Sequence, residues 1–289
     1  MTAPAGLDSV RDALRWGESR LRRAGIRNAF MESAWLLAAR TSAGNAGDLI
    51  LRRSEKISAP ARRDYRADVS RRGLRVPLAY ILGSQEFMGL EFRADPRALI
   101  PRPETEVLAR AAIEFVASRA GRARMIDIGT GTGVLAVVLA ARFPGVLAAA
   151  TDVSGRAIAL ARANAARFGL AGRIRFSRGE LFARARGRFD LIVSNPPYVR
   201  SGDIAGLQKE VRREPRAALD GGPDGLGVIR PLVQGSVRRL RPGGGLLLEV
   251  GDGQARGVAR LFRKAGLAGI RISRDDSGID RVVAGSAPW

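Results

Sequence analysis

The tetrad Asn195-Pro196-Pro197-Tyr198 is the stretch of this chain whose residue types most clearly suit chemistry. It follows an apolar run at 189–193 that is typical of a buried strand. A residue that precedes proline is held extended, and proline has no N–H of its own. We therefore expect the Asn195 side chain and the Pro196 carbonyl to offer two hydrogen-bond acceptors at a strand end, beside the flat surfaces of Pro197 and Tyr198. Such a pair of acceptors can hold one planar NH₂ group, although a purely structural turn is the alternative.

A glycine-rich loop supplies a second candidate site. The residues Asp127-Ile128-Gly129-Thr130-Gly131-Thr132-Gly133 follow a predicted strand and open a predicted helix. Glycines let a ligand approach the backbone, and a helix N-terminus offers free N–H groups. Asp152 ends the next predicted strand, where a carboxylate can accept both ribose hydroxyls of an adenosine. The loop also satisfies the dinucleotide pattern G-x-G-x-x-A, so a nicotinamide or flavin cofactor stays possible on this motif alone.

The composition narrows the chemistry further. The 289 residues include no Cys and no His, which excludes disulfides, zinc–thiolate sites, cysteine nucleophiles and histidine general bases. Methyl transfer from a sulfonium donor suits this inventory because the leaving group is already activated and no metal is required. The net charge is +21, from 49 basic and 28 acidic residues, which indicates either an anionic partner or an arginine-rich coding bias. No apolar run approaches the roughly 20 residues that span a bilayer, and the N-terminus has no secretory signal pattern.

Three regions must position these motifs. Residues 1–75 show helical spacing and predict a small helical bundle, whose second helix should bury Met31, Trp35 and Ala38. Residues 76–99 predict a linking β-hairpin around Gly89. Residues 100–289 alternate between strand and helix patterns, which predicts an α/β domain with a doubly wound, mostly parallel sheet. Strands are expected at 124–129, 147–152, 173–177, 188–194, 244–250, 270–273 and 280–285.

The order of these strands relates the two motifs. In a doubly wound sheet the first and fourth strands are neighbours, and ligands bind beyond their carboxyl ends. The glycine loop leaves the first strand and the tetrad leaves the fourth, so both should face one crevice. An adenosine-bearing cofactor beside a site for NH₂ favours group transfer to nitrogen.

Together the two motifs resemble those of the S-adenosylmethionine-dependent amino-methyltransferases. Within that superfamily the chain is most similar to the peptide chain release factor glutamine methyltransferases. The resemblance extends over nearly the whole length and rests on segments 76–80, 100–106, 127–133, 195–198, 214–215, 219–226 and 247–251. It implies a seven-stranded, Rossmann-like domain that binds S-adenosyl-L-methionine, with Leu181 beside the adenine where some members have Trp.

The resemblance also implies an activity and a partner. The enzymes of this family methylate the side-chain amide nitrogen of the glutamine in the Gly-Gly-Gln loop of release factors. Here that implies Asn195, Pro196 and Tyr198 as catalytic residues, with Pro197 in the substrate site, and no metal. We expect a cytoplasmic monomer whose residues 1–75 dock the protein substrate and which needs neither a membrane nor direct nucleic-acid binding. The alternatives are a ribosomal protein glutamine methyltransferase, a nucleic-acid adenine or guanine methyltransferase, an inactive binding module and a redox enzyme.

Overall fold

The computed structural model describes residues 7–289, which form two compact units. The first unit contains the chain up to Gly83 together with Lys209–Arg213, and the second contains Ser84–Gln208 and Glu214–Trp289. Within the described residues, none of the helices has the length and apolar character needed to cross a membrane.

The first unit is a bundle of short helices. They are α1 (Val10–Arg23), α2 (Ala29–Ala38), α3 (Ala46–Leu51), α4 (Ala59–Gly73) and α5 (Leu78–Leu82). Tyr65 of α4 is fully buried, and its hydroxyl lies 2.6 Å from Ser33 Oγ and 3.0 Å from the Ala13 carbonyl. The Tyr65 ring fits there because Gly17 has no side chain, since a Cβ at that position would lie 1.8 Å from the Tyr65 hydroxyl.

Two features of this unit differ from the sequence prediction. Met31 and Trp35 of α2 are 38% and 41% exposed, so the prediction that this helix buries them is wrong. Ala34, Leu36 and Leu37 face the core instead. The short helix α5, which ends at Gly83 in a left-handed conformation, lies inside the segment expected to form only a hairpin.

The second unit opens with the predicted hairpin, formed by β1 (Ser84–Phe87) and β2 (Leu90–Arg93). The sheet strands are β3 (Arg122–Ile128), β4 (Gly145–Asp152), β5 (Ile174–Arg178), β6 (Phe189–Ser194), β7 (Leu240–Glu249), β8 (Ala268–Arg274) and β9 (Asp280–Ser286). The helices are α6 (Thr105–Ala117), α7 (Val134–Arg142), α8 (Gly155–Arg167), α9 (Ile229–Arg239) and α10 (Ala255–Lys264). Three short 3₁₀ turns, Ile204–Gly206, Val211–Arg213 and Arg216–Ala218, follow β6 in the chain, the second of them within the first unit.

The sheet has the order β5-β4-β3-β6-β7-β9-β8, and only β9 runs antiparallel to its neighbours. Helices α6, α7 and α8 pack on one face, and α9 and α10 pack on the other. Successive side chains of the central strands point to opposite faces of the sheet and pack against the helices on each face. Met125 therefore belongs to one core cluster and Ile126 to the other. The predicted fold class is thus confirmed: a seven-stranded, doubly wound α/β domain with a preceding helical bundle and a β-hairpin.

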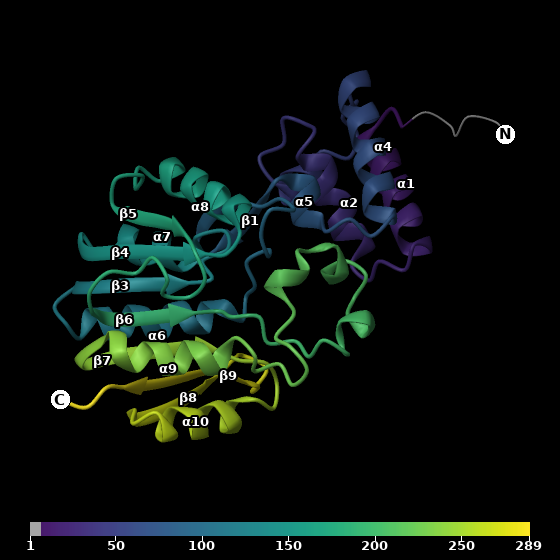
Figure 1. Cartoon of the computed structure of the whole chain (residues 1–289). Helices are drawn as coiled ribbons and strands as arrows, with labels where there is room; N and C mark the ends of the chain where they lie inside the picture. Colours follow the sequence, from purple (N-terminus) through teal and green to yellow (C-terminus); the bar gives the residue numbers. More distant parts are fainter. Residues whose placement is uncertain (1–6) are drawn as a thin grey trace. The chain divides into compact units, whose positions relative to one another are not determined.

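This topology decides where a ligand can bind. Strands β3 and β6 are hydrogen-bonded neighbours, from Met125 opposite Leu191 to Asp127 opposite Val193. In Figure 1 the arrows of β4, β3 and β6 point in the same direction, so their carboxyl ends share one edge of the sheet. At that edge the Ser194 hydroxyl donates to the Ile128 carbonyl (2.6 Å), which ties the two strand ends together.

Candidate active site

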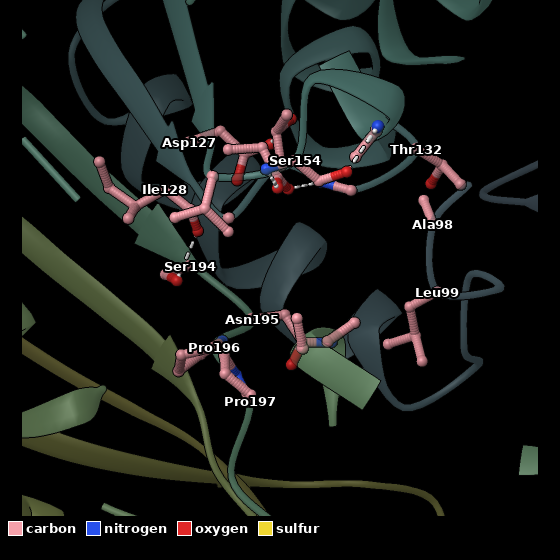
Figure 2. Close-up of a pocket in the computed structure, with 18 of the residues that line it drawn as sticks. Ala98, Leu99, Asp127, Ile128, Thr132, Ser154, Ser194, Asn195, Pro196 and Pro197 are labelled. Atoms are coloured by element: carbon pink, nitrogen blue, oxygen red, sulfur yellow. Dashed lines mark hydrogen bonds between the residues drawn. The ribbon is translucent and has the colours of Figure 1, made fainter. Parts of the chain in front are cut away.

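A cavity of about 280 Å³ lies beyond the carboxyl ends of β3, β4 and β6. Figure 2 shows Asn195, Pro196 and Pro197 on one side of this space and Thr132 and Ser154 on the other. The predicted site residues that line it are Gly129, Thr130, Gly131, Thr132, Asp152, Leu181, Asn195, Pro196 and Pro197. The two motifs, more than sixty residues apart in the sequence, therefore share one cavity.

The glycine loop is shaped by its backbone. Gly129, Gly131 and Gly133 all have positive φ, of 71°, 55° and 87°, which is the left-handed region where a side chain would be strained. Gly133 does not line the cavity; a Cβ there would lie 3.0 Å from the Ala161 Cβ, so this glycine allows α7 to approach α8 closely. The loop thus brings backbone, rather than side chains, to the cavity wall.

Asp152 is fixed in place by the loop that it faces. Its Oδ2 accepts from the Gly131 N–H (3.0 Å) and its Oδ1 from the Ser154 N–H (2.8 Å). Burial raises the pKa of this carboxyl above its usual value, while the two backbone donors act in the opposite direction. Each oxygen keeps a further lone pair, so the carboxylate can still accept hydroxyl groups of a ligand.

Asp127 is a site residue that our sequence reasoning did not single out. Its Oδ2 accepts from the Thr130 hydroxyl (2.6 Å), whereas its Oδ1 is buried and has no hydrogen-bond partner of normal geometry. Burial raises the pKa of Asp127 to about 7. This unpaired, buried oxygen lies in a residue of the cavity wall. A ligand cation or N–H donor in the cavity would stabilise it by supplying the missing partner. The position of Asp127 at a strand end, directly before the glycines, was the available signal.

Asn195 leaves one end of its amide open. The Nδ2 group donates to the Thr105 hydroxyl (3.0 Å). Within residues 7–289 no group donates a hydrogen bond to Asn195 Oδ1 or to the Pro196 carbonyl. Both residues line the cavity, so two acceptors at its edge are available to a ligand.

Tyr198 has a different environment from the rest of the tetrad. It is not among the residues that line the cavity. Its hydroxyl donates to Glu249 Oε1 (3.2 Å), and its carbonyl accepts from the Gln254 side chain (2.9 Å). Burial, with the nearby Glu249 carboxylate, raises the pKa of the Tyr198 hydroxyl. The ring therefore packs behind the tetrad, and its direct contact with a substrate stays a prediction.

The segment before α6 forms one wall of the cavity. In the sequence this segment is recognised only as part of the family resemblance, and no place in the site is predicted for it. Ile100, Pro101 and Arg102 line it together with Thr105. Glu214 holds this wall in place, since its Oε2 accepts from the Ile100 N–H (2.9 Å) and its Oε1 pairs with the Arg102 guanidinium. The contact joins segments more than 110 residues apart in sequence, so periodicity could not have revealed it.

Comparisons with known proteins agree with this geometry. Residues 109–256 match the family described as methyltransferase small domain, and residues 12–83 match the PrmC N-terminal domain. The chain is 42% identical to the release factor glutamine methyltransferase of Geobacter sulfurreducens over 99% of both chains. It is 41% identical to that of Cereibacter sphaeroides over 96% of this chain and 98% of the relative. Among solved structures, a methyltransferase from Pyrococcus furiosus shares the fold, with a TM-score of 0.54 and 19% identity over 76% of this chain and all of that one. The chain therefore belongs to the release factor glutamine methyltransferase family.

Proposed function

We propose that this protein transfers a methyl group from S-adenosyl-L-methionine to the side-chain amide nitrogen of the glutamine in the Gly-Gly-Gln loop of peptide chain release factors. The observation that carries the proposal is the shared cavity, where a glycine loop with Asp152 faces two open acceptors on Asn195 and Pro196. Membership of the family supports the same substrate.

The residues of the cavity fit S-adenosyl-L-methionine. Asp152 would accept the ribose hydroxyls, and Asp127 would receive the ammonium group of the methionine part on its unpaired oxygen. Leu181 would supply an apolar contact for the adenine. The cofactor, when bound, supplies a methyl group whose bond to a positively charged sulfur breaks as the new bond to nitrogen forms.

The two open acceptors suit a carboxamide. An amide nitrogen is a poor nucleophile because its lone pair is delocalised into the carbonyl. Its two N–H groups would donate to Asn195 Oδ1 and to the Pro196 carbonyl, which would orient the nitrogen and stabilise the positive charge that develops on it. The methylated nitrogen then returns to a neutral amide by losing one proton. No strong base is needed before the attack, which fits a chain without histidine.

The first unit would dock the protein substrate. On its helix α2, the partly exposed side chains of Met31 and Trp35 lie one helical turn apart. Exposed aromatic and methionine side chains are enriched in protein interfaces. In this proposal the protein acts as a cytoplasmic monomer on one release factor at a time.

Labelled methyl donor tests the proposal directly. The protein is incubated with a purified release factor, with the same factor carrying alanine in place of the loop glutamine, and with ribosomal RNA. We expect label in the unmodified factor alone. Label in RNA, or equal label in the glutamine-free factor, would contradict the proposed substrate.

A further inference from the structure

We infer that a second surface of this protein binds structured RNA through the phosphate backbone. The surface is a groove of about 480 Å³ on the sheet of the second unit. Strands β3, β4 and β5 and the segments that flank β5 form it, and we call it the arginine groove after five of its residues, Arg124, Arg173, Arg175, Arg184 and Arg186. None of these five lines the cavity that contains Asn195 and Asp152, so the inference goes beyond the proposed function.

The groove exists because no helix covers this part of the sheet. On this side α9 and α10 lie against β7, β8 and β9, whereas the chain passes from β5 to β6 as a loop (Figure 1). Leu147, in the middle of β4 and opposite Arg124 of β3, is consequently 70% exposed. Parallel strands are usually buried on both faces. The exposure of Leu147 therefore marks a face of the sheet that a partner can reach.

The charge of the arginine groove has a single sign. Among the described residues that line it, none is acidic. The candidate active site, in contrast, is lined by two arginines and three acidic residues. An arginine-rich coding bias adds basic residues throughout the chain, but it does not remove acidic residues from one surface. The groove thus holds a local excess of positive charge, which favours an anionic partner.

The five arginine side chains are of two kinds. Arg124 donates to the Arg186 carbonyl (2.7 Å), and Arg173 donates to three carbonyls around the end of α7 (2.7 to 3.1 Å). Arg175, Arg184 and Arg186 are exposed, and within residues 7–289 their side chains have no hydrogen-bond or ion-pair partner. The groove therefore offers two guanidinium groups that are held in place and three that are free to bind a ligand.

The shape and the residue types of the groove favour RNA among polyanions. Guanidinium groups bind phosphate oxygens through paired hydrogen bonds, and a regular row of phosphates can engage several of them at once. The sheet surface has no protruding helix that could enter the major groove of DNA. A-form RNA has a wide, shallow minor groove that proteins contact through phosphates and 2′-hydroxyl groups, and the half-buried Ser177 offers a hydroxyl for such a contact. Phe189, the aromatic residue of the groove, is 2% exposed, so contact with the backbone is expected and stacking on bases is not.

Fluorescence anisotropy with a short labelled RNA hairpin tests the inference without methyl donor or release factor. We expect the hairpin to bind, and the affinity to fall as salt rises from about 50 to 200 mM, with a log–log slope of about −2 to −4 for three to five phosphate contacts. A triple variant with Arg175→Gln, Arg184→Gln and Arg186→Gln should bind at least about tenfold more weakly, and the magnitude of its slope should be smaller by about 2.

Helix α10 supplies the matched control. Arg256, Arg260 and Arg263 are exposed and have no ion-pair partner among the described residues. Replacing all three by Gln removes the same net charge from another part of the second unit. This control variant should bind the hairpin within about threefold of wild type. Equal weakening in the two triple variants would show that net charge alone drives binding, and would overturn the inference.

Further outcomes decide the identity of the partner. A wild-type protein that does not bind the hairpin at about 100 mM salt would overturn the inference, as would equal affinity for a DNA hairpin of the same sequence. Polyglutamate that displaces the hairpin as well as unlabelled RNA does would assign the groove to an acidic protein instead. Methyl transfer to a release factor should be unchanged in the groove variant, and a raised KM with unchanged affinity for RNA would assign the groove to the release factor. A protein that binds the hairpin but methylates no release factor would refute only the proposed function.

Discussion

Replacing Asn195 by alanine removes one hydrogen bond within the protein and one acceptor oxygen that has no donor among the described residues. The Nδ2 group makes a single bond, to Thr105, and Oδ1 receives none from the described residues. One such bond contributes about 0.5–1.5 kcal/mol to stability. We therefore expect a fall in melting temperature of only a few degrees.

The same substitution should have a much larger effect on turnover. Deletion of one hydrogen bond that stabilises charge in a transition state costs about 2.7–4 kcal/mol, or 10²–10³ in kcat. The assay is methyl transfer to a release factor at saturating donor, with donor affinity measured separately by calorimetry. We expect kcat to fall by that factor while the donor dissociation constant changes little.

Asn164 offers a matched control within the same unit. It is fully buried and makes three hydrogen bonds, two with the backbone of Arg93 (2.8 and 3.2 Å) and one to the Thr132 carbonyl (2.9 Å). Asn164→Ala should therefore reduce stability by more than Asn195→Ala, by roughly 2–4 kcal/mol. If Asn195→Ala turned over at nearly the wild-type rate, or lost activity only in proportion to its loss of stability, the proposed role of Oδ1 would be refuted.

Three further changes test other parts of the molecule. Asp152→Ala should raise the donor dissociation constant about 10–100-fold with the fold retained, because a charged acceptor is lost; calorimetry giving an unchanged constant would exclude the ribose role. Glu249 has a folded-state pKa of about 7, above its ordinary 4.5, so the folded state binds more protons between these values. The titration of Glu249 should therefore lower the free energy of unfolding by roughly 3 kcal/mol between pH 4.5 and 8. In Glu249→Gln the free energy of unfolding should fall less over this range, and the fall that is left comes from Asp127. Denaturation curves measured across this pH range check this, and an equal fall in both proteins would contradict the burial argument. Trp35→Ser should raise KM for the release factor several-fold without weakening donor binding, and an unchanged KM would remove Trp35 from the docking surface.

Much of the second unit could be predicted because its signals are local. The central strands β6 and β7 contain apolar runs, whereas β5 and β8 alternate apolar residues with arginine or serine, and each of the seven expected positions overlaps the observed strand. The neighbouring positions of β3 and β6 then follow from the rules of doubly wound sheets. This is why the crevice between the glycine loop and the tetrad could be predicted from order along the chain.

The errors arise where long-range packing decides the outcome. On α2 the pattern of apolar residues is almost continuous, so periodicity could not tell that Leu36 and Leu37, and not Trp35, face the core. The contacts of Thr105 with Asn195 and of Tyr198 with Glu249 join residues 90 and 51 positions apart. No local pattern marks such pairs, and the three-dimensional fold alone brings them together.

The most direct test of the account counts methyl groups on one residue. A release factor is treated with the protein and excess S-adenosyl-L-methionine until no more methyl is transferred, and the peptide that contains the Gly-Gly-Gln loop is analysed by mass spectrometry. Because both N–H groups of the amide are needed to satisfy Asn195 and Pro196, we predict one methyl group on the glutamine nitrogen and no second one. A loop glutamine that stays unmodified, or that becomes dimethylated, would contradict the account.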